Sequence, residues 1–377
     1  MRLFAQRTKL KVSKTLILAY LAFSLSCIQF EESELDPSSL LSDLRLLQTA
    51  NEFTAKDITS YSIPSIGATG LINGTEIYLI AENLNNLNPL VATFTSSGKS
   101  VRIGSTTQIS GSTENSYTET LTYVVSARDN SEKTYKVKLF APRTVSASNL
   151  KAWFKGNSLS LANGSNVSFW ADSSGNSNDV STASNFPTFL ANAKNGFPAV
   201  LFPGGVDRSL AKTGGTDLNT TAHTILTVFK PVVAVNIVII SIGTGGCGIT
   251  DKVFQILNDG TINTGVCNAY SINLSSVLNS NTYYIAAVSS INNTGTPFLF
   301  LDGTSTVGTF SGNGSLTYTN PNSNMAIGKR AVDNSSFFNG EIAEVLYYNT
   351  NLSVANTQTL ICYLSKKYAI PVSSSCF

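Results

Sequence analysis

The sequence predicts an all-β protein of two β-sandwich modules with one helix near the C-terminus. Charged residues make up only 13% of the 377 residues, about half the share of an ordinary globular protein. Serine, threonine, asparagine and glycine take their place. Short runs of alternating apolar and polar residues recur, and turn residues separate them, which is typical of sandwich domains. The length is comfortable for two domains.

The first 26 residues have the three parts of an export signal. Arg2 to Lys14 carries five basic residues and no acidic one. The apolar run Thr15 to Phe23 follows, and it is shorter than the roughly 20 residues that span a bilayer. Ser24-Leu25-Ser26 then leads into Cys27. We therefore expect residues 1–26 to be a signal peptide.

The overall charge of +2 comes from this segment. Without it, 20 basic residues face 23 acidic ones, a net charge of −3. A chain with this balance has no basic surface to neutralise phosphates. The composition therefore excludes nucleic acid as a partner.

The sequence around Cys27 resembles the lipobox of bacterial lipoproteins in the relaxed form found in spirochaetes. It departs from the strict pattern because Ser24 stands where leucine is usual. The resemblance implies that Cys27 receives lipid and becomes the mature N-terminus, which anchors the protein in the cell envelope, at the outer membrane or cell surface. The alternative is ordinary cleavage, with Cys27 incidental.

Residues 27–55 are expected to be a tether with a short helix, since Leu40, Leu41, Leu44 and Leu47 have helical spacing. Residues 56–143 contain about seven short strands punctuated by Gly and Asn turns, which predicts an Ig-like sandwich. ITSYSI from Ile58, LVATFTSSG from Leu90 and TYVVSARDNSEKTYKV from Thr122 resemble bacterial Ig-like or cadherin-like repeats. In such proteins this module is a spacer or an adhesive unit.

Residues 146–377 have the size of a large β-sandwich. LKAWF from Leu150, FWADSSGNSND from Phe169, NGFPAVLF from Asn195 and FNGEIAEVLYY from Phe338 resemble the concanavalin A-like, laminin G-like jelly-roll family. The family hosts lectins, adhesion modules and glycan hydrolases, so the resemblance implies a fold and not one function. Ser353 is expected to cap a closing helix whose apolar stripe is Leu360, Ile361, Leu364 and Tyr368.

Four cysteines remain once Cys27 is assigned to lipid. Cys247 and Cys267 flank a hairpin signal with its turn at Asn258-Asp259-Gly260, so antiparallel pairing would place them opposite each other. Cys362 and Cys376 would tie the C-terminal tail to the closing helix. A catalytic cysteine is the alternative, but it requires a base and the only histidine is His223.

We expect no catalytic residues. Retaining glycan hydrolysis requires two carboxylates about 5–5.5 Å apart. The only glutamates in the sequence after residue 146 are Glu341 and Glu344. Their odd spacing on a strand points them to opposite faces unless a bulge intervenes. Glu341 is expected to make a turn contact and Glu344 to face solvent.

The loop from Asp172 to Asp179 is the candidate metal site. Asp172, Asn176, Asn178 and Asp179 offer hard oxygens that suit Ca²⁺. The alternative is that these side chains cap tight turns. No other cofactor is expected.

Aromatic side chains that stack on sugars come from a pool of Trp153, Trp170, Tyr283, Tyr284, Phe337, Tyr347 and Tyr348. Trp153 and Trp170 lie in strand patterns and are expected in the core. Tyr347 and Tyr348 point to opposite faces, so one of them can be exposed. Loops at 333–339 and 312–314 are possible rims, and no single ligand-binding residue stands out.

The sequence thus predicts a lipid-anchored surface protein that binds or adheres and does not catalyse. Its expected partner is a glycan or a host or extracellular-matrix glycoprotein, recognised by the C-terminal module. A structural envelope lipoprotein without a specific ligand and a glycan hydrolase are the alternatives.

Overall fold

The computed structural model describes residue 48 and residues 51–376, apart from 85, 219, 221, 244–251, 267–269, 291–297, 308, 312–322 and 332–334. Residues 56–377 form one compact unit, and residues 51–54, which precede it in the chain, are helical. The signal peptide, Cys27, the helix at 40–47, Cys247, Cys267 and the rim at 312–314 lie outside the described residues.

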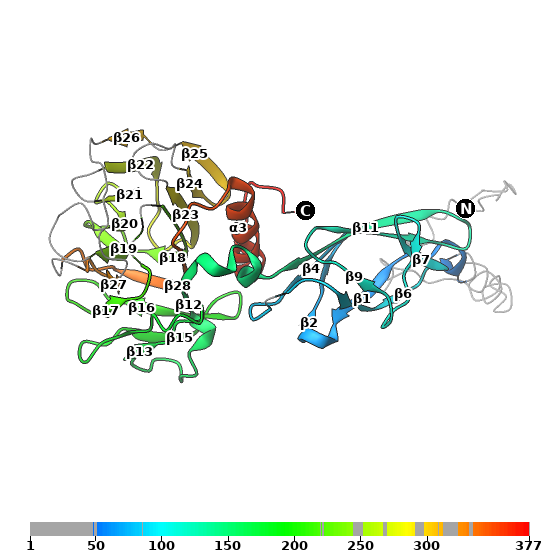
Figure 1. Ribbon diagram of the computed structural model, residues 1–377, viewed down its shortest axis with the longest axis horizontal. Helices are drawn as coiled ribbons and strands as arrows, with labels where there is room; N and C mark the ends of the chain where they lie inside the picture. The colour runs from blue at the N-terminus through cyan, green and yellow to red at the C-terminus, as the bar shows by residue number, and fades with distance from the viewer. Residues whose placement is uncertain are drawn as a thin grey trace, which may run out of the picture. The chain divides into compact units, whose positions relative to one another are not determined.

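The first module is a β-sandwich, as the sequence predicts. Its main sheets have the strand orders β2-β1-β6 and β3-β4-β11-β10-β7-β8, and β5 pairs with β9 (Figure 1). The strands are β1 (Ile58–Ile63), β2 (Ala68–Thr69), β3 (Leu71–Asn73), β4 (Glu76–Ile80), β5 (Leu90–Val91), β6 (Thr93–Ser96), β7 (Ser100–Ile103), β8 (Thr106–Thr107), β9 (Glu114–Asn115), β10 (Leu121–Ser126) and β11 (Glu132–Phe140).

Alternation along these strands builds the core of the first module. In β10 the side chains of Tyr123 and Val125 are fully buried, while their neighbours are more exposed. The hydroxyl of Tyr61 lies 2.6 Å from that of Tyr117 and 2.8 Å from that of Tyr123. These hydrogen bonds satisfy buried polar groups in a core without a disulfide. Strands β10 and β11 form an antiparallel hairpin, and Asn130 in its turn adopts the left-handed conformation with φ 63°.

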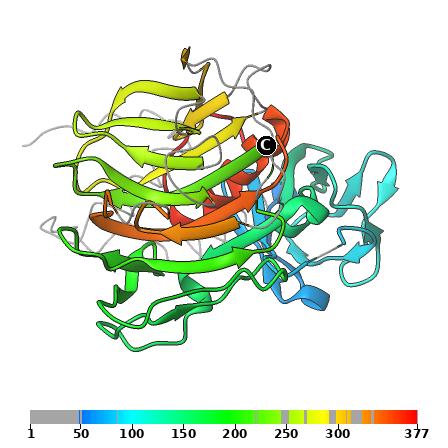
Figure 2. The ribbon, with the colours of Figure 1, turned by 60° about the vertical axis from the view of Figure 1, so that its left-hand side comes forward.

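The C-terminal module consists of two large sheets. One has the order β15-β16-β28-β18-β23-β24-β25, with β12 also paired to β28, and the other has the order β13-β14-β17-β27-β19-β20-β21-β22-β26. Figure 2 shows β27, in orange, between β17 and β19. The strands are β12 (Leu150–Lys155), β13 (Phe169–Trp170), β14 (Val180–Ser181), β15 (Thr188–Lys194), β16 (Phe197–Phe202), β17 (Leu210–Gly215), β18 (His223–Pro231), β19 (Ile237–Gly243), β20 (Lys252–Ile256), β21 (Thr261–Val266), β22 (Tyr270–Val277), β23 (Tyr284–Ser290), β24 (Phe298–Leu301), β25 (Thr304–Val307), β26 (Thr309–Ser311), β27 (Ser323–Ile327) and β28 (Gly340–Tyr348).

Short 3-10 helices occur at the ends of several strands. They are η1 (Pro64–Ile66), η2 (Pro142–Thr144), η3 (Ala147–Asn149) and η4 (Gly156–Ser158). The segment that joins the two modules contains η2 and η3, and Pro142 is buried.

The eight-stranded sheet is covered on both faces. Trp170, Phe154 and Tyr347 belong to the buried cluster shared with the nine-stranded sheet. On the other face, Trp153 and Tyr348 pack with the helix α3 (Val354–Tyr368). Every residue of β28 is buried for this reason.

Helix α3 forms as the sequence predicts. Ser353 caps it by accepting a hydrogen bond from the backbone N–H of Asn356 at 3.2 Å. The predicted stripe of Leu360, Ile361, Leu364 and Tyr368 is fully buried. The helix contacts β23 and β18 in its own module and β4 and β11 in the first. Within the described residues, no helix has both the length and the apolar character that crossing a membrane requires.

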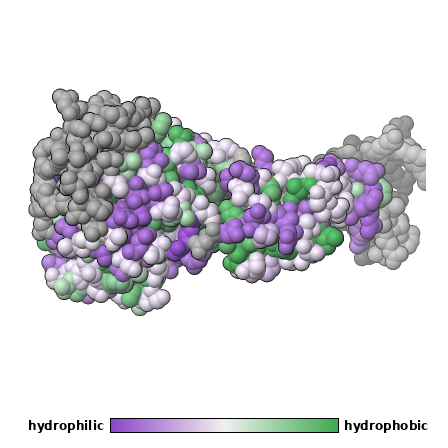
Figure 3. All heavy atoms as spheres, in the orientation of Figure 1, coloured by the Kyte–Doolittle hydropathy of each residue, from purple (hydrophilic) through white to green (hydrophobic). Residues whose placement is uncertain are grey.

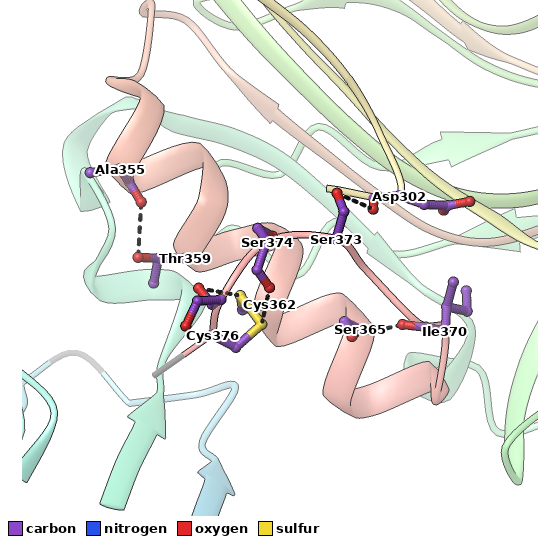
Figure 4. The surroundings of a disulfide bond; sticks show 10 residues. Asp302, Ala355, Thr359, Cys362, Ser365, Ile370, Ser373, Ser374 and Cys376 are labelled. Carbon is purple, nitrogen blue, oxygen red and sulfur yellow. Dashed lines mark hydrogen bonds between the residues drawn. A yellow bond between two sulfur atoms is a disulfide. The ribbon is translucent and has the colours of Figure 1, made fainter. Parts of the chain in front are cut away.

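A disulfide joins Cys362 of α3 to Cys376 in the tail, with their Cα atoms 5.4 Å apart (Figure 4). This is one of the two pairings that the sequence predicts. The tail is also held where the backbone N–H of Ser373 donates to the carbonyl of Asp302 at 2.9 Å. The C-terminal segment is therefore fixed against both the helix and the sheet.

Candidate functional site

The two glutamates of β28 lie on the same side of their sheet. The pairing of β18 with β28 shifts between Val228, which faces Glu344, and Phe229, which faces Ile342. This bulge cancels the odd spacing, so both carboxylates point toward the face that α3 covers. The expectation that Glu344 faces solvent is wrong, because its side chain is fully buried.

Glu344 is surrounded by hydrogen-bond donors. Its Oε1 accepts from Trp153 Nε1 and from the hydroxyl of Tyr363, each at 2.7 Å. Its Oε2 accepts from Lys367 Nζ at 2.7 Å and from the hydroxyl of Tyr368 at 2.8 Å. Burial and the adjacent Glu344 charge raise the pKa of both tyrosines well above the usual value. The two hydroxyls therefore remain neutral donors.

A second carboxylate reaches this cluster from the first module. Glu82, two residues beyond β4, accepts from Lys155 Nζ at 2.8 Å, and its other carboxylate oxygen lies 3.0 Å from the hydroxyl of Tyr363. It also pairs with Lys367. Burial acts to raise the pKa of Glu82, but the charges of Lys367 and Lys155 outweigh burial and lower it to about 2.

The cluster is electrically balanced. Two carboxylates, Glu82 and Glu344, face two ammonium groups, Lys155 and Lys367, and the side chain of Lys367 has no exposed surface. A buried charge is tolerated only when it is paired and hydrogen-bonded. Through Glu82, the cluster connects the first module to the second.

Glu341 has separate partners. It pairs with Lys230 and accepts a hydrogen bond from the hydroxyl of Tyr283. Burial and the carboxylate raise the pKa of Tyr283. Glu341 is therefore held by a cation of the neighbouring strand β18 instead of by the turn contact that the sequence suggests.

The predicted calcium loop organises the start of β12. Asp172 Oδ1 accepts from the backbone N–H groups of Trp153 at 2.9 Å and Ser174 at 2.8 Å. Its Oδ2 accepts from the hydroxyl of Ser174 at 2.7 Å and from the backbone N–H of Asn178 at 3.0 Å. Asp179 Oδ1 accepts from the N–H of Asp172 at 2.8 Å.

The two asparagines of the loop bind neighbouring carbonyls. Asn176 Nδ2 donates to Leu150 O and Asn178 Nδ2 donates to Lys151 O, each at 2.8 Å. These are the turn-capping roles that the alternative predicts. In the described part of the chain, no three acidic, histidine or cysteine side chains are grouped as metal ligands. Calcium at Asp172, Asn176, Asn178 and Asp179 stays a prediction.

The aromatic pool is mostly core. Trp153 and Trp170 are fully buried, as predicted. The prediction that one ring of Tyr347-Tyr348 is exposed is wrong. The two rings do point to opposite faces, but one lies between the sheets and the other under α3, so both are fully buried.

A pocket of about 310 Å³ lies next to β13, the edge strand of the nine-stranded sheet, and combines apolar with hydrogen-bonding side chains. Its apolar lining is Leu159, Leu161, Phe169 and Ala171, and its polar lining is Ser158, Ser160, Asn166 and Ser168. We call it the Phe169 pocket. Phe169 is 51% exposed and Leu161 is 39% exposed. The visible hydrophobic areas of this module in Figure 3 are small, and some lie at the lower edge where Figure 1 places β13 and β15.

The loop that forms this pocket is held from both sides. At its start, the Ser158 hydroxyl donates to Lys155 O at 2.8 Å. Further along, the N–H of Gly164 donates to Phe189 O and the N–H of Phe189 donates to Ser165 O, each at 2.8 Å. Asn163 Oδ1 accepts from the N–H of Ala191 at 2.9 Å. The pocket is therefore built before any ligand arrives, which lowers the entropy lost on binding.

The pocket also has unused hydrogen-bonding groups. The side chains of Ser160, Asn166 and Ser168 are exposed and have no hydrogen-bond partner among the described residues. Sequence reasoning missed this site, although one signal was available. Trp170 is a core residue, so strand alternation turns its neighbour Phe169 outward.

No family model matches this chain, and no curated protein resembles it in sequence. Among solved structures, it is similar to domain 4 of AbnA, an extracellular GH43 arabinanase from Geobacillus stearothermophilus in complex with arabinotriose. The identity is 15% and the TM-score 0.41, over 56% of this chain and 98% of that one.

Two further structures show the same kind of similarity. The SAP-like pentraxin from Limulus polyphemus has 16% identity and a TM-score of 0.36, over 44% of this chain and 82% of that one. The CBM40 of the Ruminococcus gnavus IT-sialidase, bound to alpha2,3 sialyllactose, has 17% identity and a TM-score of 0.33, over 40% of this chain and 98% of that one. At these identities and TM-scores the similarities establish neither a family nor a function for this chain.

Proposed function

We propose that this protein is a lipid-anchored surface protein that binds a glycan, free or on a glycoprotein, through the Phe169 pocket of its C-terminal module. The observation that carries the proposal is the exposed Phe169 ring beside three polar side chains that have no hydrogen-bond partner among the described residues.

This combination matches the chemistry of a sugar ring. One face of a pyranose carries C–H groups that pack on an aromatic ring, and its edge carries hydroxyl groups that need hydrogen bonds. Phe169 and Leu161 offer the apolar surface. Ser160, Asn166 and Ser168 offer both donors and acceptors.

The lipid anchor rests on the sequence. A basic segment, a short apolar run and Cys27 follow one another in the order of a lipoprotein signal. Attached acyl chains would hold the protein at the membrane and present the C-terminal module to partners outside the cell.

Binding is tested with the full chain in detergent, applied to an array of glycans and matrix glycoproteins. We expect retention on glycans, and we expect Phe169→Ala to weaken it by at least about tenfold. Phe53→Ala is the matched control, because Phe53 is an equally exposed phenylalanine, at 53%, outside the C-terminal module. A blank array, or equal loss in both variants, would contradict the proposal.

The anchor is tested by metabolic labelling with radioactive palmitate in the organism that makes the protein. We expect the label to enter the wild-type chain and to be absent from Cys27→Ser. Label that persists in this variant would place the lipid elsewhere, and an unlabelled wild type would remove the anchor from the proposal.

A further inference from the structure

We infer that the Phe169 pocket selects an uncharged sugar residue and disfavours sialic and uronic acids. The inference rests on the proposed function, because it names the substrate class of the same pocket. Three observations support it. The pocket lining carries no charge, the charged residues nearest in sequence are bound to other groups, and the polar side chains of the lining are hydroxyls and an amide.

The lining of the Phe169 pocket contains no ionisable side chain. A sugar carboxylate that enters loses part of its water shell, and this is costly unless a cation replaces the water. Proteins that recognise carboxylates supply arginine or lysine for this purpose. The pocket offers only hydroxyl and amide groups, so a carboxylate gains less there than it loses.

The charged residues nearest in sequence are turned to other partners. Lys155, at the end of β12, directs its Nζ to Glu82 at 2.8 Å. Asp172, which follows the pocket residue Ala171, accepts hydrogen bonds from the N–H groups of Trp153 and Ser174. Neither side chain is available to pair with a charge on a ligand.

The remaining groups suit hydroxyls. Serine hydroxyls and the asparagine amide each donate and accept, and a sugar hydroxyl does both. The volume of about 310 Å³ lies at the lower end of the range for small-molecule sites. The pocket therefore fits one ring of a longer chain, and the remaining rings extend into solvent.

The test compares sugars that differ by one charged residue. Binding of the full chain in detergent is measured by calorimetry for lactose and sialyllactose, and for galactose and galacturonic acid. We expect each neutral sugar that binds to bind at least about tenfold more tightly than its acidic counterpart. We expect Phe169→Ala to weaken this binding by at least about tenfold, while Phe169→Tyr, which keeps the ring, preserves it.

A second variant separates charge from shape. Asn166→Lys places a cation in the pocket, so we expect it to raise the affinity for the acidic sugars and to lower that for the neutral ones. Acidic sugars that bind the wild type as tightly as neutral ones, with loss in Phe169→Ala, would overturn the inference and leave the proposed function intact. Binding of glycans that is insensitive to Phe169→Ala would remove this pocket from both, and no binding to any glycan would end the proposed function itself.

Discussion

Glu82 and Lys367 are 285 residues apart in the chain, and their side chains form an ion pair at the junction of the two sandwich modules. Lys367 also pairs with Glu344, and Lys155 completes the set from β12. The first module thus supplies one of two carboxylates that neutralise two lysines of the second. A fragment beginning at residue 146 would lack this carboxylate.

We expect Glu82→Gln to destabilise residues 56–377 by about 3–5 kcal/mol, because it leaves a buried ammonium group uncompensated. Chemical denaturation of the full chain measures this. The matched control is Glu132→Gln, since Glu132 pairs with Arg102 at the surface, where both side chains are 40% exposed or more. Such a pair contributes at most about 1 kcal/mol. Equal losses of unfolding free energy in the two variants would mean that the buried cluster stabilises the protein no more than a surface ion pair does.

Acid should weaken the same junction. The pKa of Glu82 is about 2 in the folded protein, below its ordinary 4.5, so the folded state binds protons less readily than the unfolded chain. The stabilisation is therefore complete above pH 4.5 and is lost as the pH falls through the folded value. We expect the wild type to lose more stability between pH 5 and about pH 2 than Glu82→Gln loses. If stability fell equally with pH in the wild type and in Glu82→Gln, the pKa of Glu82 would not be lowered in the folded protein.

Glu82 and Lys367 should be energetically coupled. Removing both charges, in Glu82→Gln combined with Lys367→Met, leaves Glu344 and Lys155 as one carboxylate and one ammonium group. We expect the double variant to be more stable than the sum of the two single losses implies, by about 1–3 kcal/mol. Denaturation of all four proteins gives the coupling energy. A strictly additive result would show that the two charges act independently.

The disulfide of α3 should stabilise the C-terminal segment. Cys362 and Cys376 are separated by 14 residues, and closing a loop of this length is worth about 3 kcal/mol on the chain-entropy model. We expect Cys362→Ala with Cys376→Ala to lose about this amount in thermal or denaturant unfolding. Cys376→Ala alone breaks the same bond and should lose as much. An unchanged unfolding midpoint in both variants would contradict the prediction.

Phe169 and Trp170 are adjacent, but truncating them should change stability by very different amounts. Trp170 is fully buried and its indole N–H donates to Lys155 O at 2.9 Å, so Trp170→Ala should cost about 3–5 kcal/mol. Phe169→Ala should change stability by no more than about 0.5 kcal/mol, because the ring lies at the surface. A large loss in Phe169→Ala would assign this ring to the fold instead of to a ligand.

The strands were predictable because alternation and turn residues are local signals. Tyr123 and Val125 alternate with less buried neighbours along β10, and Asn130 marks the hairpin that follows. The closing helix was predictable for the same reason, since Ser353 and the stripe that ends at Tyr368 lie within one segment.

The buried cluster was not predictable from local patterns. The burial of Glu344 depends on Trp153, Lys367 and Glu82, which come from distant segments. The bulge in the pairing of β18 with β28 leaves no mark in the sequence, although it turns Glu344 toward these partners. Tyr347 and Tyr348 are both buried because β28 is covered on both faces. The two adjacent tyrosines give no sign of this in the sequence, because the covering depends on the order of the strands and on α3.

Because α3 packs on β4 and β11, Tyr78, Ile80 and Phe140 share a buried cluster with a helix translated much later. A ribosome that has finished the first module has made no part of residues 354–368. These apolar side chains are therefore open to water, and to any chaperone, for the time that synthesis of more than half the chain takes. The first module thus completes this part of its buried surface only when the last helix arrives, and such long-range contacts favour slow folding.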